Sequence, residues 1–309
     1  MIEILRRELI YLWYYFSIQF EQIVWYWLFG MALGSLISVF GKEKIHALFV
    51  KMRDTKMGTF GIVPASLLGI ASPLCMYGTI PIAASFAEKG MAEDWIAAFV
   101  MSSILLNPQL LFYSAALGLP ALVIRFVSCF LCGIAAGICI TLFYKKKPFF
   151  SFSKFENMAS RDTDPNLVIR YLKNFGRNIK ATGLYFLVGI ILSSLFQRYV
   201  PQDAFAALFG NNKGFGILMA AAVGVPLYVC GGGTIPLLLT WMQSSMSLGS
   251  ASAFMITGQA MKITNLGAVK IVLGVKHFLF YILFTVLFAL LSGFAVDYFE
   301  TVFFRGQQL

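Results

Sequence analysis

Long apolar stretches alternate with short polar loops along most of the chain. A helix needs about 17–25 mainly apolar residues to cross a bilayer, and several of these stretches reach that length with their Tyr and Trp flanks. The helices of a soluble globule would need polar faces, which these stretches lack. The pattern predicts an all-α polytopic membrane protein. The apolar stretches are Trp25–Phe40, Trp95–Leu117, Ala121–Phe143, Ala181–Phe196, Ala251–Val269 and Phe278–Val296.

Composition agrees with a chain that lies in a lipid bilayer. The mean hydropathy is +0.78, 59% of residues are hydrophobic and 12% are charged, whereas soluble domains have about 25% charged residues. The net charge of +10 is explained by basic loops beside anionic lipid, so no nucleic-acid partner is expected.

The first residues are amphipathic and do not resemble a cleaved signal sequence. Residues 1–21 are predicted to form an interfacial helix, with Trp13, Tyr14 and Tyr15 at the level of the lipid headgroups. The alternative is a simple N-terminal extension of the first span. The apolar face of this helix consists of Ile2, Leu5, Leu9, Leu12 and Phe16.

The sequence repeats at an offset of 155 residues. At this offset PLCMYGTIP aligns with YVCGGGTIP, so that Cys75 falls on Cys230 and Gly78–Pro81 on Gly233–Pro236. Gly69 falls on Gly224 in the same register. Matched Gly, Cys, Thr and Pro residues predict two homologous halves. The expected organisation is an interfacial helix at 1–21, repeat 1 at 22–143, a basic cytoplasmic linker at 144–178, repeat 2 at 179–298 and a tail at 299–309.

The motif of each half either crosses the membrane or enters it and returns. A crossing gives parallel halves and divides the basic residues of the loops almost evenly, whereas a re-entrant hairpin places most of them on one side. Cytoplasmic loops carry an excess of Lys and Arg. The charge distribution therefore predicts two inverted-topology repeats, each with about three transmembrane helices and a re-entrant broken-helix hairpin. The basic residues left outside are Arg6, Arg7, Arg198, Lys213 and Arg305.

Each hairpin is predicted to unwind around its Gly and Pro residues. The entering helices are expected near Phe60–Ser72 and Phe215–Val225, and the returning helices are expected to start at Thr79 and Thr234, which would serve as N-caps. Non-helical backbone at this depth must be buried in protein or line a watery cavity. Two broken elements at matching positions indicate a central binding site of the kind found in secondary transporters.

Polar groups near the hairpins are the candidates for substrate binding. Lys262 lies in an apolar stretch, where a charge is costly, and its repeat partner is Asn107. The glycine run would let the backbone approach a ligand closely; the alternative is that it only lets the hairpins cross tightly. Lys262 would bind the substrate; the alternative is that it only bonds to backbone carbonyls. The candidates are Cys75, Tyr77, Gly78, Thr79, Asn107, Cys230, Gly231, Gly232, Gly233, Thr234, Gln259, Lys262, Thr264 and Asn265.

The thiols of Cys75 and Cys230 occupy the two predicted turns. Thiolates are soft ligands for metalloids, and Lys262 together with the helix N-termini would favour the thiolate. Cys129, Cys132 and Cys139 are interpreted as apolar fillers. No deep carboxylate, Walker motif, catalytic triad or HExxH motif is present in the sequence. We therefore expect no enzyme activity, catalytic residue, resident metal or cofactor.

The motifs resemble those of the ArsP-like predicted permeases. The resemblance covers residues 25–295 and is carried by PLCMYGTIPIAASFAEKG, GVPLYVCGGGTIPLLL and TGQAMKITNLGAVKIVLG. It implies efflux of trivalent organoarsenicals across the bacterial cytoplasmic membrane, and hence arsenical resistance. Where the family often has a second thiol in Pro-x-Cys-Ser-Cys-Gly, this chain has Met76-Tyr77.

Two classes of function follow from these patterns. The first is a secondary-type permease for a small thiophilic substrate, or alternatively for a small sulfur-containing or other inorganic anion. The second is a membrane thiol-redox protein that uses Cys75 and Cys230, although redox dithiols usually lie close together in sequence. A channel is the weakest alternative because no charged ring is present. The expected partners are a small-molecule or metalloid substrate and the lipid bilayer. The sequence leaves open whether the chain forms a homo-oligomer.

Overall fold

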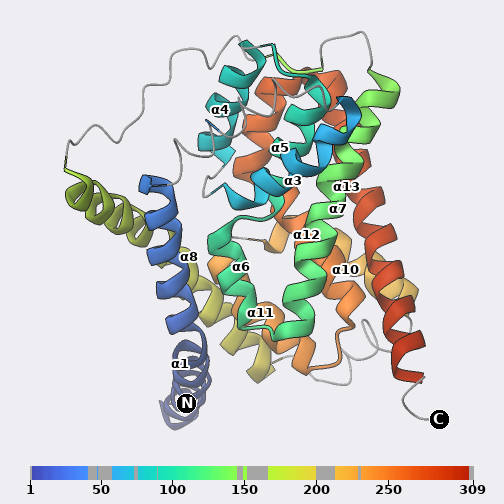
Figure 1. Cartoon of the computed structure of the whole chain (residues 1–309). Coiled ribbons are helices and arrows are strands. Elements are labelled where there is room, and N and C mark those ends of the chain that lie inside the picture. Colours follow the sequence, from blue (N-terminus) through green and yellow to red (C-terminus); the bar gives the residue numbers. More distant parts are fainter. Residues whose placement is uncertain are drawn as a thin grey trace.

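The computed structural model describes residues 2–40, 47, 58–72, 76–88, 90–144, 149–151, 166–199, 213–228 and 231–305. Every regular element within these ranges is a helix, as the sequence predicted (Figure 1). The elements are α1 (Ile2–Phe40), the 3₁₀ helix η1 (Gly58–Gly61), α3 (Ile62–Ala71), α4 (Met76–Glu88), α5 (Glu93–Leu105), α6 (Pro108–Ala115), α7 (Leu119–Phe143), α8 (Leu167–Tyr199), α10 (Lys213–Leu227), α11 (Gly231–Gln243), α12 (Leu248–Met261) and α13 (Ile263–Arg305).

Three helical segments of the described chain have the length and composition of membrane spans. They are Glu93–Ala115, Leu119–Phe143 and Val269–Val302. Leu119, Val123, Leu142 and their neighbours on α7 and α13 are exposed, as expected for side chains that face lipid rather than water. Most residues of the segment Glu93–Ala115 are instead buried inside the molecule, so it forms the centre of the bundle.

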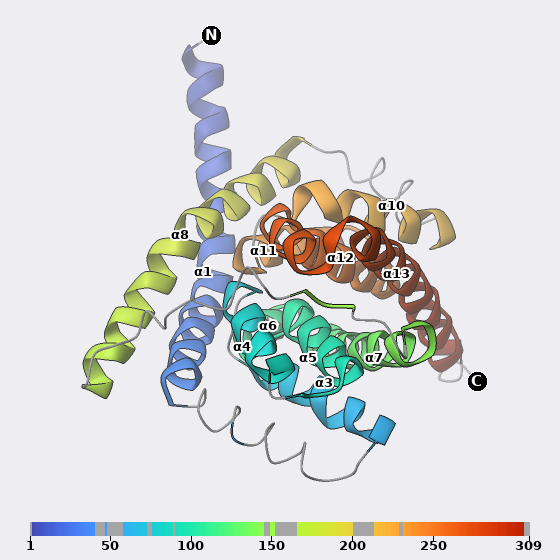
Figure 2. The ribbon, with the colours of Figure 1, turned by 90° about the horizontal axis from the view of Figure 1, so that it is seen from above.

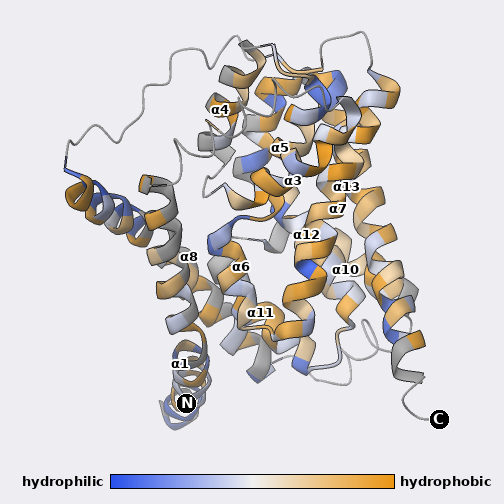
Figure 3. Cartoon of the chain, in the orientation of Figure 1, coloured by the Kyte–Doolittle hydropathy of each residue, from blue (hydrophilic) through white to orange (hydrophobic). Residues whose placement is uncertain are grey.

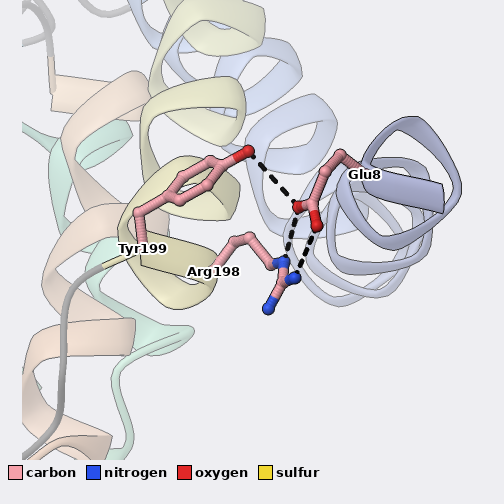
Figure 4. Close-up of polar contacts among 3 residues, drawn as sticks. All are labelled: Glu8, Arg198 and Tyr199. Atoms are coloured by element: carbon pink, nitrogen blue, oxygen red, sulfur yellow. Dashed lines mark hydrogen bonds and ion pairs between the residues drawn. The ribbon is translucent and has the colours of Figure 1, made fainter. Parts of the chain in front are cut away.

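The first helix, α1, runs without a break from Ile2 to Phe40. The residues predicted as an interfacial helix and those of the first apolar stretch therefore lie on one helix, which projects from the bundle and crosses α8 (Figure 2). At the crossing Glu8 accepts bonds of 2.8 and 2.7 Å from the Nε and Nη2 atoms of Arg198, and the Tyr199 hydroxyl lies 3.4 Å from the same carboxylate (Figure 4).

Helix boundaries recur at the offset found in the sequence. Helices α4 and α11 begin at Met76 and Gly231 and have the same length. Helices α5 and α12 begin at Glu93 and Leu248, and α6 and α13 at Pro108 and Ile263, so each pair is again 155 residues apart. The two halves therefore share one order of elements.

Helix α13 consists of two helices joined at Gly274, and the second one corresponds to α7. Gly274 has φ 67° and ψ 173°, and Gly118, which precedes α7, has φ 94° and ψ 161°. Positive φ favours glycine because it has no Cβ. Gly137 of α7 and Gly293 of α13 also contact matching residues, Ile62 and Ile217.

Corresponding elements lie at opposite ends of the bundle and run in opposite directions (Figure 1). Helices α3 and α4 lie at the upper end, whereas α10 and α11 lie at the lower end, near both termini. Helix α7 rises through the bundle and the last part of α13 descends. Seen from above, α3–α7 and α10–α13 form two facing groups, with α1 and α8 beside them (Figure 2).

Two apolar stretches predicted as spans contain a break at matching positions. The first break lies at Leu106 and Asn107, which have extended backbone; Asn107 caps α6 by accepting a bond of 2.8 Å from the Leu110 amide. The second lies at Lys262, with φ −51° and ψ 135°, whose carbonyl accepts bonds from the first turn of α13. Polar residues are coloured blue at these junctions in Figure 3.

The prediction that Thr79 and Thr234 are N-caps is wrong. Helices α4 and α11 begin three residues earlier, at Met76 and Gly231, so both threonines lie within the first turns. Thr79 instead shares a hydrogen bond of 2.8 Å with Ser103. A glycine in a helix costs about 1 kcal/mol, whereas an unpaired backbone group in a bilayer costs several. The chain therefore resumes its helix before the threonine.

Candidate functional site

The two breaks meet at the centre of the bundle. Gln259, just before the second break, donates a hydrogen bond of 3.0 Å from Nε2 to the carbonyl of Ile104, just before the first break. These two residues are 155 positions apart, so each is the repeat partner of the other. The contact therefore joins equivalent positions of the sequence repeat.

Asn265 strengthens this junction from the other side of the second break. Its Nδ2 donates a hydrogen bond of 2.8 Å to the carbonyl of Gln259, which the interrupted helix leaves exposed. The side-chain Oε1 of Gln259 is buried without a hydrogen-bond partner among the described residues. A buried acceptor without a donor costs about 1–3 kcal/mol. The junction thus holds one acceptor that a ligand hydrogen could satisfy.

Lys262 and Asn107 are repeat partners that have different roles. The side chain of Asn107 caps α6. The side chain of Lys262 is partly buried, and within the described part of the chain its ammonium group has no hydrogen bond or ion pair. The break thus carries one cation that is free to bind a negative group. The alternative prediction is that Lys262 only bonds to backbone carbonyls. The described residues include no such bond.

Each hairpin packs against the broken span of the opposite half. Helix α11 contacts α6, and α4 contacts α13. Helix α11 opens with Gly231, Gly232 and Gly233, and the first amides of a helix have no partner within it. The unpaired amides and the partial positive charge of this N-terminus therefore belong to a helix that packs against α6, the helix after the first break.

Several predicted site residues lie beyond what the structure describes. Cys75 and Cys230 are outside the described residues. The backbone of Tyr77, Gly78 and Thr264 is helical, but their side-chain environments are not described. Their roles in substrate binding therefore stay predictions. Thr234 is buried in α11, as Thr79 is in α4.

Sequence reasoning missed Arg125, which has the largest fully buried side chain among the described residues. It lies on α7 with 1% of its surface exposed. Its Nη1 donates a bond of 2.6 Å to the Ser114 hydroxyl on α6, and its Nη2 lies 3.3 Å from the hydroxyl of Tyr228 at the end of α10. The signal was a lone charge within the apolar stretch Ala121–Phe143, where intramembrane charges usually mark function.

An apolar cavity of about 50 Å³ lies beside the first break, between α5, α7 and α13. Ile104 lines it at the break, and Cys139 and Tyr281 line its wall. Tyr281 donates a hydrogen bond of 2.9 Å to the carbonyl of Ala260, one residue after Gln259. Cys139, predicted as a filler, thus lies at a cavity, whereas Cys129 and Cys132 are fully packed.

The segment 149–151 forms one side of this cavity, which Phe149 and Phe150 line. Phe149, which lines the cavity, donates its backbone N–H to Glu93 at 2.6 Å, and its carbonyl lies 3.0 Å from Nδ1 of His277. The Ser151 amide donates a bond of 2.8 Å to the Val272 carbonyl. Hydrogen bonds to α5 and α13 therefore hold this strap, residues 149–151, along one side of the cavity.

No resident metal site is seen in the described part of the chain. Among those residues, no group of three or more His, Cys, Asp or Glu side chains could hold an ion. What the site offers is two helix breaks at positions 155 residues apart, a lysine ammonium group without a partner among the described residues, and an adjoining apolar cavity. These features suit the binding of a small solute within a membrane.

Comparisons with known proteins agree with this arrangement. The profile of the ArsP_1 family, described as predicted permease, matches residues 12–298. The UPF0718 protein YcgR of Bacillus subtilis (strain 168) is 23% identical over 278 residues, which cover 86% of this chain and 90% of that protein. No solved structure gives a significant match. The chain is a multi-pass membrane protein and belongs to the ArsP_1 family of predicted permeases.

Proposed function

We propose that the protein is a secondary-type permease built from two inverted repeats, each with three crossings and a re-entrant hairpin. The observation that carries the proposal is the contact between Gln259 and Ile104, which joins the broken spans of the two halves at equivalent positions of the repeat. Broken helices at matching positions are the usual substrate site of such transporters. Helices α3 and α10, with 10 and 15 residues, are too short to cross a bilayer that needs about 20.

The preferred substrate is a small thiophilic molecule such as a trivalent organoarsenical, exported across the cytoplasmic membrane of a bacterium. Family membership and the thiols of Cys75 and Cys230 support this choice. The apolar cavity beside the break suits the organic part of such a molecule. We propose transport rather than an enzymatic or redox role, because Cys75 and Cys230 lie in separate halves of the sequence whereas redox dithiols usually lie close together.

A small sulfur-containing or other inorganic anion is the second candidate. The free ammonium group of Lys262 favours it, because an unpaired cation in a membrane attracts a negative ligand. One mechanism accommodates both substrates. Lys262 and the helix N-termini stabilise a thiolate that binds the soft substrate, or they hold the anion itself.

Alternating access would be produced by rocking of the two halves around the fixed break. In the described state, hydrogen bonds hold the strap 149–151 along one side of the cavity. Opening toward the cytoplasm would require Phe149 to leave the cavity and its bonds to Glu93 and His277 to break. This position of the strap would therefore belong to only one state of the transport cycle.

The test is protection of a sensitised bacterium against trivalent methylarsenite. Cells would express wild type, Cys75→Ala, Cys230→Ala, Lys262→Ala or the matched control Lys270→Ala, with membrane expression verified. Lys270 is an exposed lysine of the same helix, α13. We expect protection by wild type and Lys270→Ala and its loss in the other variants. Protection that survives all substitutions would disprove the site, and no protection by wild type would disprove the arsenical substrate.

A further inference from the structure

The guanidinium group of Arg125 is buried with an incomplete set of partners. Its Nε is enclosed and has no hydrogen-bond partner among the described residues. The two groups that it does contact, Ser114 and Tyr228, are neutral hydroxyls, and no carboxylate within the described chain forms an ion pair with it. A buried charge is costly unless it is paired. The missing partner is therefore expected to be a negative group.

The N–H donors of Arg125 that lack a strong acceptor lie along one edge of its guanidinium group. Nη1 is engaged by Ser114 at 2.6 Å, while Nη2 has only the long contact of 3.3 Å with Tyr228. The N–H of Nε and one N–H of Nη2 point in parallel, and this edge binds the two oxygens of a carboxylate or similar oxyanion. Both donors of that edge are thus unused or weakly used.

Arg198 shows in the same molecule what this edge does when an anion is available. Its Nε and Nη2 donate to the two oxygens of Glu8 at 2.8 and 2.7 Å (Figure 4). Arg125 presents the same pair of atoms without a carboxylate. We propose that the Nε and Nη2 edge of Arg125 is a binding site for a small oxyanion that supplies the two missing acceptor oxygens.

The location of Arg125 links this site to transport. Ser114 lies on α6, the second part of the first broken span, and Tyr228 lies two residues before Cys230 at the end of the entering helix of the second hairpin. An oxyanion at Arg125 would therefore contact elements of both halves. The inference that oxyanions are the transported class rests on the proposed function. Oxyanion binding itself can be measured without transport.

Binding would be measured on the full-length protein purified in detergent. Thermal unfolding, followed by tryptophan fluorescence, would be recorded against sulfate, thiosulfate, phosphate and acetate, with chloride at equal ionic strength. We expect saturable stabilisation by at least one oxyanion and none by chloride. Arg125→Lys should weaken the apparent affinity about tenfold or more, because an ammonium group cannot present the two-donor edge. Arg198→Lys should bind as wild type does.

A second variant covers the case in which Arg125→Lys does not fold. Ser114→Ala keeps the charge but removes the acceptor that fixes Nη1, and it should weaken oxyanion binding by roughly tenfold. The proposal is overturned if no oxyanion stabilises wild type, if chloride acts equally well, or if both variants bind as wild type does. Counterflow of the bound oxyanion in proteoliposomes then separates a transported substrate from a resident ion. Binding without arsenite protection would leave this site standing while the arsenical proposal fails.

Discussion

Helices α3 and α10 each pack against a central helix through one glycine that leaves no room for a side chain. A Cβ added at Gly69 on α3 would lie 2.5 Å from the carbonyl oxygen of Phe99 and 2.9 Å from the Cβ of Ser102. At Gly224 on α10 it would lie 2.6 Å from Oγ1 of Thr257 and 3.0 Å from the carbonyl oxygen of Phe254. Small residues let membrane helices approach closely. Substitution by Ala should therefore push each hairpin away from its span.

The two substitutions should differ in magnitude because different atoms stand in the way. Overpacking costs about 1–3 kcal/mol, and Ala recovers up to about 1 kcal/mol of helix propensity. At Gly69 the nearest atom belongs to the backbone of α5 and cannot rotate aside, so a net loss of about 2 kcal/mol is expected. At Gly224 the nearest atom is a side-chain hydroxyl, so the expected loss is about 1 kcal/mol.

Unfolding midpoints of the purified variants provide the measurement. Gly267→Ala is the matched control, because nothing lies within 4 Å of a Cβ at this helical glycine, and it should not destabilise. The double variant Gly224→Ala with Thr257→Ala should recover most of the loss, since the obstructing hydroxyl is gone. Equal midpoints for Gly69→Ala and Gly267→Ala would refute the inference that close packing positions the hairpins.

Two further predictions concern charge and hydrogen bonding. Hydrogen bonds from Arg198 hold the pKa of Glu8 below its ordinary value of 4.5. The ion pair therefore stabilises the fold above pH 4.5, and this contribution is lost as the pH falls through the lowered pKa. The unfolding midpoint of Glu8→Gln should fall less than that of wild type between about pH 7 and acid, and an equal fall would contradict this. Gln259→Met removes the donor to Ile104 but also the unpaired Oε1, so we expect stability within about 1 kcal/mol of wild type and a loss of transport in the bacterial assay. Full protection by this variant would show that the junction is not required.

The internal repeat could be found from sequence because it is carried by residues with strong backbone preferences. Gly, Pro and Thr are constrained by conformation, so their coincidence at one offset is informative even in an apolar chain. The structure places the starts of α4 and α11 at this same offset. The offset becomes 156 between Gly118 and Gly274, a shift that cannot be recognised where the intervening residues are nearly all apolar.

The breaks within the central spans were harder to predict. Averaged hydropathy hides a single polar position such as Asn107 or Lys262, because the apolar residues around it dominate the window. A local signal was present at the first break, since the residue before a proline is biased away from the helical region, and Asn107 precedes Pro108. At Lys262 no proline follows. There the break depends on tertiary bonds, including that from Asn265 to Gln259.

Arg125 was visible in the sequence as a lone charge in an apolar stretch, but its contact with the second half could not be predicted. Its contact Tyr228 is 103 residues away, and only the fold brings the two together. The error in the N-cap assignment has a different cause. Capping preferences are measured for helices that end in water, where an uncapped amide can bond to solvent. Within a bilayer the free amide has no such alternative, so the helix begins earlier.

The chemistry of the site lies where the two halves depart from their symmetry. A symmetric fold supplies two breaks and two hairpins, but Lys262 has an uncharged partner in Asn107. Arg125 corresponds, at the offset of 156, to Tyr281, which bonds to the backbone carbonyl of Ala260. Each half therefore contributes one intramembrane cation at a position where the other half has a neutral group. We expect this asymmetry to favour negative charge on the solute, or on the thiolate that binds it.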